Sequence, residues 1–266
     1  EGVYLNGKKW NGSGYNINGN IEFIIKNGKG YIKEYDYKGK LDYDGEYLYG
    51  ERNGIGKEYD SDDKLEYEGN FFNGRRCGKG KEYYTNGKLK FEGEYLNGKK
   101  WNGNGYNING KIEFIMKFGK GNIKEYDNYN GRLIYEGEYL NGRRNGKGRE
   151  FDFYGKLKFE GEYLNGKRNG KGKEFYTNGK LKFEGEYLNE KKWNGKGYNI
   201  NDNLEFELKD GNGNIKEYEF FDKLVFEGEF LNGRRNGKGK EFDYFDGKLE
   251  YEGEYLNGER NGIGKE

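Results

Sequence analysis

The segment KLKFEGEYLNGKRNGKGKEFYTNG, residues 156–179, decides how this chain folds. Its first eight residues alternate strictly: Lys and Glu occupy one side, and apolar residues or glycine occupy the other (Leu157, Phe159, Gly161, Tyr163). Strict alternation with a period of two is typical of a half-buried β-strand. The pattern therefore predicts a strand with one apolar face and one face of Lys and Glu, which suits cross-strand ion pairs.

Two Asn-Gly pairs, Asn165–Gly166 and Asn178–Gly179, interrupt the segment. Asn-Gly is a strong hairpin signal because both residues tolerate the positive φ that a type I′ turn requires. We expect a type I′ turn at both places. The repeat then consists of two short strands and contains no helix.

The second strand, around Gly170 to Phe175, alternates less regularly. Gly170 and Gly172 fall on the same side as Glu174, which leaves Phe175 on the other side. Either a β-bulge after Gly172 shifts the alternation, or some aromatic side chains lie on the second face. Glycine within a strand often marks a close approach, and we expect aromatic rings of the neighbouring unit to make it.

The segment recurs along the whole chain. Glycines that follow Glu or Asp mark the units, and most lie 24 or 25 residues apart (Gly2, Gly45, Gly69, Gly93, Gly137, Gly161, Gly185, Gly228, Gly253). Intervals of 43 or 44 residues hide shortened units that begin at Ile21, Ile112 and Leu204. The sequence predicts one continuous array over residues 1–266, which we interpret as a fragment of a longer array.

The fold class that follows is all-β: an elongated, single-layer antiparallel meander of about twelve stacked β-hairpins. Each unit contacts only its neighbours, as in other repeat proteins, and strand twist coils the ribbon. Three tryptophans, Trp10, Trp101 and Trp193, lie 91 and 92 residues apart. They divide the array into super-repeats of roughly residues 1–91, 92–183 and 184–266.

Phe159 to Gly172, FEGEYLNGKRNGKG, resembles the MORN repeat, whose usual pattern is Tyr-x-Gly-x-aromatic, then Asn-Gly-Lys, then Gly-x-Gly. The resemblance covers essentially the whole chain and is closest to the variant form of the repeat. It implies stacked β-hairpins and roles as scaffolds, protein-interaction surfaces or lipid-associated modules, without catalytic residues.

The composition argues against catalysis and against metal binding. The chain has no His and one cysteine, Cys77, so the usual proton carriers and zinc ligands are missing. We therefore expect no catalytic, cofactor-binding or metal-binding residues. The net charge of +1 gives no reason to expect nucleic-acid binding. Nothing in the sequence indicates a cellular compartment.

Two local departures from the repeat have alternative interpretations. Asp60–Asp63 replaces a turn, and clustered carboxylates also suit Ca²⁺; we favour the turn. Cys77 replaces an Asn beside Arg75 and Arg76, where a thiol pKa could be lowered; we favour a plain substitution.

Basic residues gather in the loops between the strands of each hairpin (Arg75, Arg76, Arg143, Arg144, Lys167, Arg168, Arg234, Arg235). They are either a solvated rim that protects against aggregation or a surface for anionic lipid or phosphate. We favour the rim, because Glu residues lie close by in every strand.

The Trp-bearing loops are one residue longer than the others, and each precedes a shortened unit. Trp10, Trp101 and Trp193 either fold over and fill the notch beside the short hairpin, which we favour, or form a ladder of exposed sites.

The sequence therefore predicts a non-enzymatic scaffold for protein–protein interaction, with weak self-association through its uncovered apolar face or its ends. The alternatives are a carbohydrate- or cell-surface-binding module that uses exposed Trp and Tyr, and a lipid-associated module that uses the basic loops.

Overall fold

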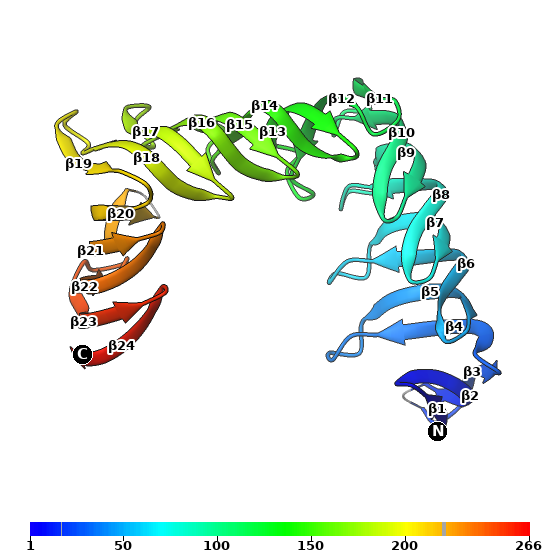
Figure 1. Ribbon diagram of the computed structural model, residues 1–266. Helices are drawn as coiled ribbons and strands as arrows, with labels where there is room; N and C mark the ends of the chain where they lie inside the picture. The colour runs from blue at the N-terminus through cyan, green and yellow to red at the C-terminus, as the bar shows by residue number, and fades with distance from the viewer. Residues whose placement is uncertain (17, 220–221) are drawn as a thin grey trace. The chain divides into compact units, whose positions relative to one another are not determined.

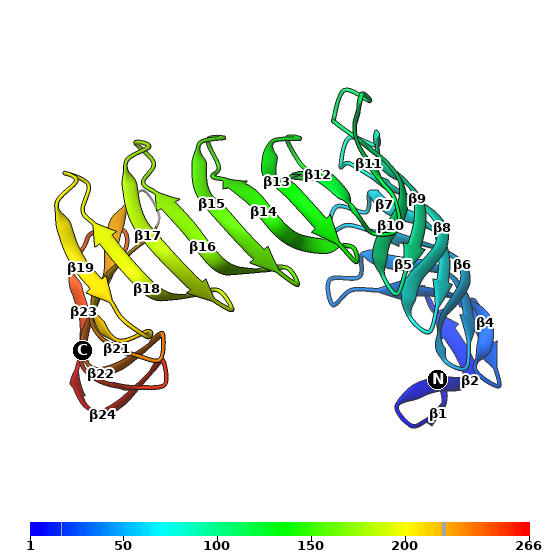
Figure 2. The same cartoon turned by 45° about the horizontal axis from the view of Figure 1, so that its top comes forward.

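The chain is built only of antiparallel β-hairpins, as the computed structural model shows for residues 1–16, 18–219 and 222–266 (Figures 1 and 2). The described residues form 24 strands and no helix, and consecutive strands are neighbours. The predicted all-β meander of about twelve hairpins is confirmed. Among these residues, no helix long and apolar enough to cross a membrane occurs.

The strands belong to three open sheets. The first contains β1 (Gly2–Leu5), β2 (Lys8–Tyr15), β3 (Ile21–Lys26), β4 (Lys29–Tyr35), β5 (Leu41–Leu48), β6 (Glu51–Tyr59), β7 (Leu65–Phe72), β8 (Arg75–Tyr83), β9 (Leu89–Leu96), β10 (Lys99–Tyr106) and β11 (Ile112–Met116). The second contains β12 (Gly121–Tyr126), β13 (Leu133–Leu140), β14 (Arg143–Phe151), β15 (Leu157–Leu164), β16 (Lys167–Phe175), β17 (Leu181–Leu188), β18 (Lys191–Tyr198) and β19 (Leu204–Leu208). The third contains β20 (Gly213–Glu219), β21 (Lys223–Leu231), β22 (Arg234–Phe242), β23 (Leu249–Leu256) and β24 (Glu259–Lys265).

The chain divides into two compact units. The first unit comprises residues 1–133 and 139–143, and the second comprises residues 134–138 and 144–266.

The two turns of each repeat differ from each other. Asn165 and Gly166 both have positive φ, 53° and 91°, as a type I′ turn requires. The expectation of a second type I′ turn is wrong: of Asn178 and Gly179, only Gly179 has positive φ. Its N–H donates to the Tyr176 carbonyl oxygen (2.8 Å), and the Asn178 side chain accepts from the Lys180 N–H. The side-chain bond stabilises a longer turn that needs one left-handed residue, not two.

Each Asn-Gly turn is also bonded to the preceding hairpin. The Gly98 N–H donates to the Arg76 carbonyl oxygen (2.8 Å), and the Gly166 N–H donates to the Arg144 carbonyl oxygen (2.8 Å). The same bond recurs from hairpin to hairpin, so a row of backbone hydrogen bonds fixes each turn against the previous hairpin. We call this border of the sheet the Asn-Gly edge.

A β-bulge lies opposite the end of the irregular second strand. Glu174 pairs with Phe183, and Phe175 pairs with Leu181, which leaves Lys182 as the extra residue. The bulge therefore lies in the following strand, not directly after Gly172. Regular alternation keeps Glu174 on the same face as Gly170, Gly172 and the buried rings. The alternative with aromatic side chains on the second face is therefore the one that holds: Tyr83, the equivalent of Phe175, donates its hydroxyl to Glu68 on that face.

An aromatic ring covers a pair of glycines in each full hairpin from β5 onward. Gly161 and Gly172 are paired across β15 and β16, and a methyl group on either would come within 2.6 Å of the Phe159 ring. The covering ring belongs to the same hairpin; the neighbouring Tyr187 touches the Phe159 ring edge-on, 5.2 Å between centroids. The repeat glycines that face a second glycine in this way are Gly45, Gly69, Gly93, Gly137, Gly161, Gly185, Gly228 and Gly253.

The two faces of the sheet therefore differ, and we name them the aromatic face and the lattice face. The aromatic face carries Phe159 and Tyr163, which are buried. The lattice face carries Lys and Glu in cross-strand ion pairs of 3.4 to 3.7 Å (Lys81–Glu92, Lys173–Glu184, Lys196–Glu207, Lys240–Glu252). These pairs are solvent-exposed, so each contributes little to stability.

The second and third shortened units interrupt the sheets, whereas the first keeps β3 paired with β4. Outside named strands, β11 and β12 are joined at the single bridge Lys117–Lys120, and β19 and β20 at Lys209–Asn212. On the border opposite the Asn-Gly edge, turns then meet across the short hairpin. In the second unit the Thr177 N–H donates to the Asp222 carboxylate (3.0 Å), and the Lys182 ammonium donates to the Tyr218 carbonyl oxygen (2.5 Å).

Replacing Phe159 by Ala is expected to destabilise the protein by about 3 kcal/mol, because the side chain is fully buried over two glycines. Replacing the exposed Lys158 by Ala is expected to change stability by no more than about 0.5 kcal/mol. Urea unfolding of the two variants measures the difference, and equal losses would show that the two faces are assigned wrongly.

Candidate functional surface

A cation lies over each covered ring on the aromatic face. It is an arginine over six of the rings, and Lys100 and Lys192 lie over Phe91 and Phe183. The Arg168 guanidinium carbon lies 4.2 Å from the Phe159 ring centroid, and that of Arg52 lies 4.4 Å from the Tyr43 centroid. The same stacking joins further pairs at 4.1 to 4.3 Å (Arg76–Tyr67, Arg144–Tyr135, Arg235–Phe226, Arg260–Tyr251). Each ring is thus held between a glycine pair and a cation, a favourable arrangement for both charge and packing.

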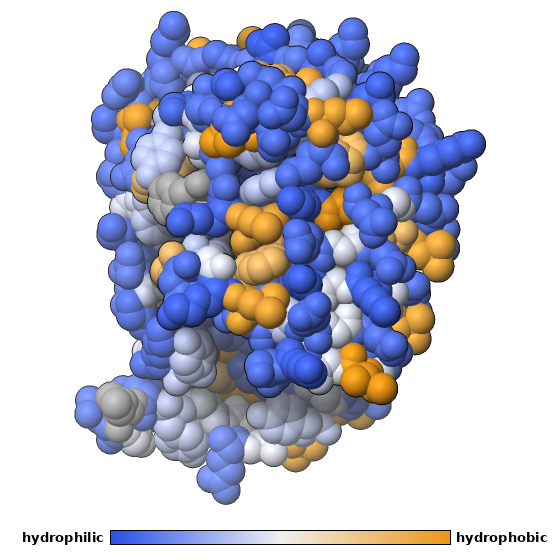
Figure 3. Space-filling view, turned by 90° about the vertical axis from the view of Figure 1, so that its left-hand side faces the viewer, coloured by the Kyte–Doolittle hydropathy of each residue, from blue (hydrophilic) through white to orange (hydrophobic). Residues whose placement is uncertain are grey.

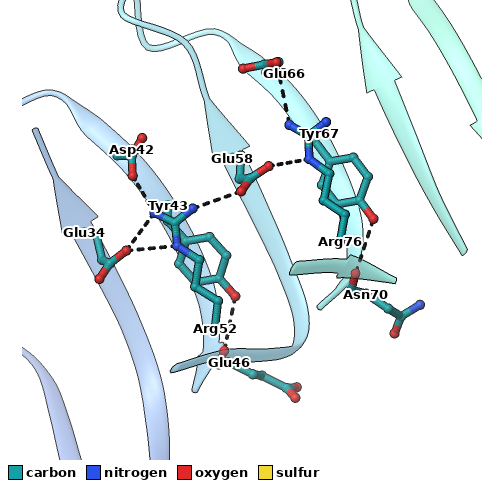
Figure 4. Close-up of polar contacts among 10 residues, drawn as sticks. All are labelled: Glu34, Asp42, Tyr43, Glu46, Arg52, Glu58, Glu66, Tyr67, Asn70 and Arg76. Carbon is teal, nitrogen blue, oxygen red and sulfur yellow. Dashed lines mark hydrogen bonds and ion pairs between the residues drawn. The ribbon is translucent and has the colours of Figure 1, made fainter. Parts of the chain in front are cut away.

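The arginines are linked by glutamates into a row that we call the ion ladder. In the first unit, Arg52 pairs with Glu34 (2.7 Å) and with Glu58 (2.9 Å). Glu58 also pairs with Arg76 (2.6 Å), which bonds Glu82 in turn. Figure 4 shows Arg52 and Arg76 over Tyr43 and Tyr67, with Glu58 between them. The phenol hydroxyls below donate to backbone carbonyls, so the ladder and the rings form one bonded network.

The second unit carries the same ladder. Glu150 bonds Arg144 and Arg168, and Glu174 bonds Arg168 and Lys192, both at 2.9 Å. Burial by itself would raise the pKa of Glu174, but the charges of Lys192 and Arg168 outweigh burial and lower that pKa to about 2. Further along, Arg235 and Arg260 both bond Glu241.

The ion ladder corrects one expectation from the sequence. The aromatic face was expected to lie uncovered and to invite self-association. Instead, guanidinium and carboxylate groups of the same unit cover its rings. Alternation along the second strand brings these charges to the aromatic face. The first strand by itself places only apolar residues and glycine there.

The predicted basic residues divide between the two faces. Arg76, Arg144, Arg168 and Arg235 lie on the aromatic face in the ion ladder. Arg75, Arg143, Lys167 and Arg234 are exposed on the lattice face. Neighbouring residues of a strand point to opposite faces, so the members of each basic pair cannot act on the same surface.

The predicted tryptophans lie against the short hairpins. A methyl group on Gly119 would come within 2.7 Å of the Trp101 ring, and the Gly119 N–H donates to the Trp101 carbonyl oxygen (2.7 Å). Trp10 and Trp193 contact Gly28 and Gly211 in the same way. All three side chains are half-buried, so each presents only part of its ring to a ligand.

The surroundings of Asp60–Asp63 and of Cys77 explain these two departures from the repeat. The Asp60 carboxylate accepts from the Asp62 and Lys64 N–H groups, and Asp63 accepts from the Leu41 N–H, so these residues build the turn. Cys77 lies opposite Asn70, and partial burial raises the pKa of its thiol. The alternative of a lowered pKa is therefore wrong.

Sequence reasoning missed a set of exposed aromatic residues in the turns opposite the Asn-Gly edge (Tyr37, Tyr129, Phe153, Tyr154, Tyr244, Phe245). They follow an Asp that accepts backbone N–H bonds and stiffens the turn, as Asp152 does from Tyr154 and Lys156. The short pattern of Asp followed by aromatics before Gly was the available signal. On the side seen in Figure 3, hydrophobic residues form small separate groups among hydrophilic ones.

Replacing Glu174 by Gln is expected to cost about 3 kcal/mol at neutral pH, because Arg168 and Lys192 lose a buried partner. The folded-state pKa of Glu174 is about 2, below the ordinary value of 4.5. Its stabilising contribution is therefore complete above that ordinary value and disappears as the pH falls to about 2. Unfolding titrations at several pH values should show the variant and the parent protein converging in acid.

The matched control is Glu184→Gln on the lattice face, whose pair with Lys173 is long and exposed. We expect a change within about 0.5 kcal/mol at every pH. A constant gap between Glu174→Gln and the parent protein down to the lowest pH would contradict the assignment.

Comparisons with known proteins agree with this architecture. The MORN repeat family matches residues 67–88, 135–151, 159–180, 226–243 and 251–266, and the MORN repeat variant matches residues 52–73. No curated protein matches the chain.

Two solved structures are similar over most of this chain. Virginiamycin B lyase from Staphylococcus aureus is 14% identical over 84% of this chain and 83% of that chain, with a TM-score of 0.24. The TcdB2-TccC3-Cdc42 structure is 11% identical over 93% of this chain but only 15% of that chain, with a TM-score of 0.17.

With five MORN repeats and one variant repeat along its hairpins, this chain belongs to the MORN-repeat proteins.

Proposed function

We propose that the chain is a non-enzymatic scaffold for protein–protein interaction. MORN repeats are in general protein- or membrane-interaction modules and form a non-catalytic repeat family. The stiffness of the hairpins supports a scaffold, since the ion ladder and the turn-to-turn bonds fix each hairpin against the previous one.

The observation that carries the proposal is that each unit has a row of exposed apolar side chains beside its Asn-Gly edge. The residue before the Asn-Gly turn is 36 to 60% exposed in most full hairpins (Leu5, Phe72, Leu96, Leu140, Leu164, Leu188, Leu231, Leu256). These side chains are not among the buried rings of the aromatic face, so they remain available for a partner. Large apolar side chains repeated on a stiff surface with a polar surround are typical of protein interaction sites.

The lipid alternative receives less support from the geometry. Arg76, Arg168 and Arg235 each bond at least two glutamates, so binding an anion would require breaking the ladder. Only the exposed first member of each basic pair remains for such contacts.

We expect the triple variant Leu164→Ser, Leu188→Ser and Leu231→Ser to lose protein partners, because it removes three steps of the apolar row in the second unit. The measurement is affinity purification of the full chain with quantitative mass spectrometry. The control variant Lys173→Gln, Glu184→Gln and Lys240→Gln changes three exposed lattice residues and should keep its partners. An identical partner set for the parent protein and both variants would contradict the proposal.

A second candidate, glycan binding, is favoured by the exposed aromatic turns more than by the tryptophans. Tyr244 and Phe245 lie with ring centroids 3.8 Å apart on a stiff turn, and Phe153 and Tyr154 occupy another. Exposed aromatic rings at a hairpin tip offer apolar faces of the kind that sugar rings pack against.

A glycan array checks the second candidate. Glycan binding by the parent protein should be lost in a variant with Phe153, Tyr154, Tyr244 and Phe245 all replaced by Ala, and a variant with the three serines above should retain it. No binding to any glycan by the parent protein would remove this candidate.

A further inference from the structure

The first unit contains a basic border that the ion ladder does not use. Phe72 on β7 lies directly opposite Arg75 on β8, and Leu96 on β9 lies opposite Lys99 on β10. The short hairpin adds Lys117 opposite Lys120, and Leu140 and Arg143 flank the next turn. We call these eight residues the edge strip.

The edge strip lies on the lattice face, along four successive turns of the Asn-Gly edge. Phe71 and Arg76, which neighbour Phe72 and Arg75, point to the aromatic face. Strand alternation therefore sends the strip to the other side. Backbone bonds hold the turns in order: the N–H groups of Gly98, Gly119 and Gly142 donate to the carbonyls of Arg76, Trp101 and Gly119 at 2.7 to 2.9 Å.

The charge of the strip is uncompensated. Arg75, Lys99, Lys117, Lys120 and Arg143 make no ion pair with any residue that the structure describes, and the eight positions include no carboxylate. The corresponding border of the second unit is different, because Glu190 and Asp210 stand within its turns. The carboxylate beside a turn of the first unit, Glu51, lies outside the edge strip and pairs with Lys8 (2.7 Å). The four turns of the edge strip therefore offer an anionic partner a basic border without a carboxylate, and the second unit has no such run of four turns.

The shape of the strip favours a narrow partner. Glu92 and Glu94 lie further along β9 on the same face and are exposed. A flat anionic surface laid on this face would also press against those carboxylates, which would repel it. A single extended peptide would contact the strip without reaching Glu92 and Glu94.

The spacing selects the conformation of such a chain. Successive hairpins lie two strands apart, about 9.6 Å. Three residues of a polyproline II helix advance about 9.3 Å and return to the same side of the helix. A carboxylate at every third residue would therefore meet a cation at every hairpin, and the residues between would reach Phe72, Leu96 and Leu140.

We propose that the edge strip of the first unit binds an acidic peptide segment in a polyproline II conformation, with a carboxylate at every third residue. The proposal rests on the proposed scaffold function and names the chemical class of its partner. Neutralising the strip removes the attraction without disturbing the fold, because its side chains take no part in the ion ladder or the core.

The test is fluorescence anisotropy of the full chain with a labelled (Glu-Leu-Pro)₄ peptide. The quadruple variant Arg75→Gln, Lys99→Gln, Lys117→Gln and Arg143→Gln should bind at least tenfold more weakly. A matched variant of the second unit, Lys167→Gln, Lys191→Gln, Lys209→Gln and Arg234→Gln, removes the same charge and should bind within twofold of the parent protein. Circular dichroism and melting should be the same for all three.

A second peptide separates spacing from charge. The same twelve residues with the four glutamates adjacent should bind at least fivefold more weakly than (Glu-Leu-Pro)₄. Equal binding of both peptides, equal weakening by the two quadruple variants, or no binding at all would each overturn the proposal. So would flotation with phosphatidylserine vesicles that depends on the strip while the peptide does not bind.

Failure of the edge-strip proposal can be told apart from failure of the proposed scaffold function. If the serine variant of the second unit loses partners while the peptide fails to bind the first, the edge-strip proposal falls and the scaffold function stands. If partners are unchanged in that variant while the peptide binds as expected, the leucines of the second unit are not the interaction surface and the edge strip of the first unit is.

Discussion

An aromatic ring lies against two glycines on adjacent strands, and a guanidinium lies on the other side of the same ring, in hairpin after hairpin of this chain. A Cβ on Gly161 or Gly172 would occupy the space of the Phe159 ring. The absence of side chains at these positions lets the ring approach the backbone closely. The ring then presents an apolar platform on which Arg168 stacks, 4.2 Å from its centroid.

This arrangement explains how a single-layer sheet buries its rings without a second layer. The arginines and glutamates take the place of the missing layer, and each charge bonds charges of its own and the neighbouring hairpin. Charges removed from water are costly unless they are paired. The network of Glu150, Arg168, Glu174 and Lys192 satisfies them and lowers the pKa of Glu174. The same requirement makes neighbouring repeats depend on one another.

Alternation along the strand gives the two basic residues of a loop separate roles. Arg76 stabilises the aromatic face, whereas Arg75 stands on the lattice face beside Phe72. Surface available for partners is therefore found on the lattice face and in the turns, where side chains contribute little to the hairpins themselves. Stability and recognition are thus carried by different faces of one layer, and a substitution can alter one without altering the other.

The sequence by itself determined the strands, the Asn-Gly turns at positions such as Asn165–Gly166, and the repeat glycines, because alternation and positive φ are local properties of a few residues. It also predicted the shortened units and MORN membership. Only the tertiary structure decided that Lys182 forms the bulge, that Arg168 and Glu174 cover Phe159, and that Trp101 lies on Gly119. These contacts join residues of different strands. Their geometry depends on register and twist, which no single strand's pattern contains.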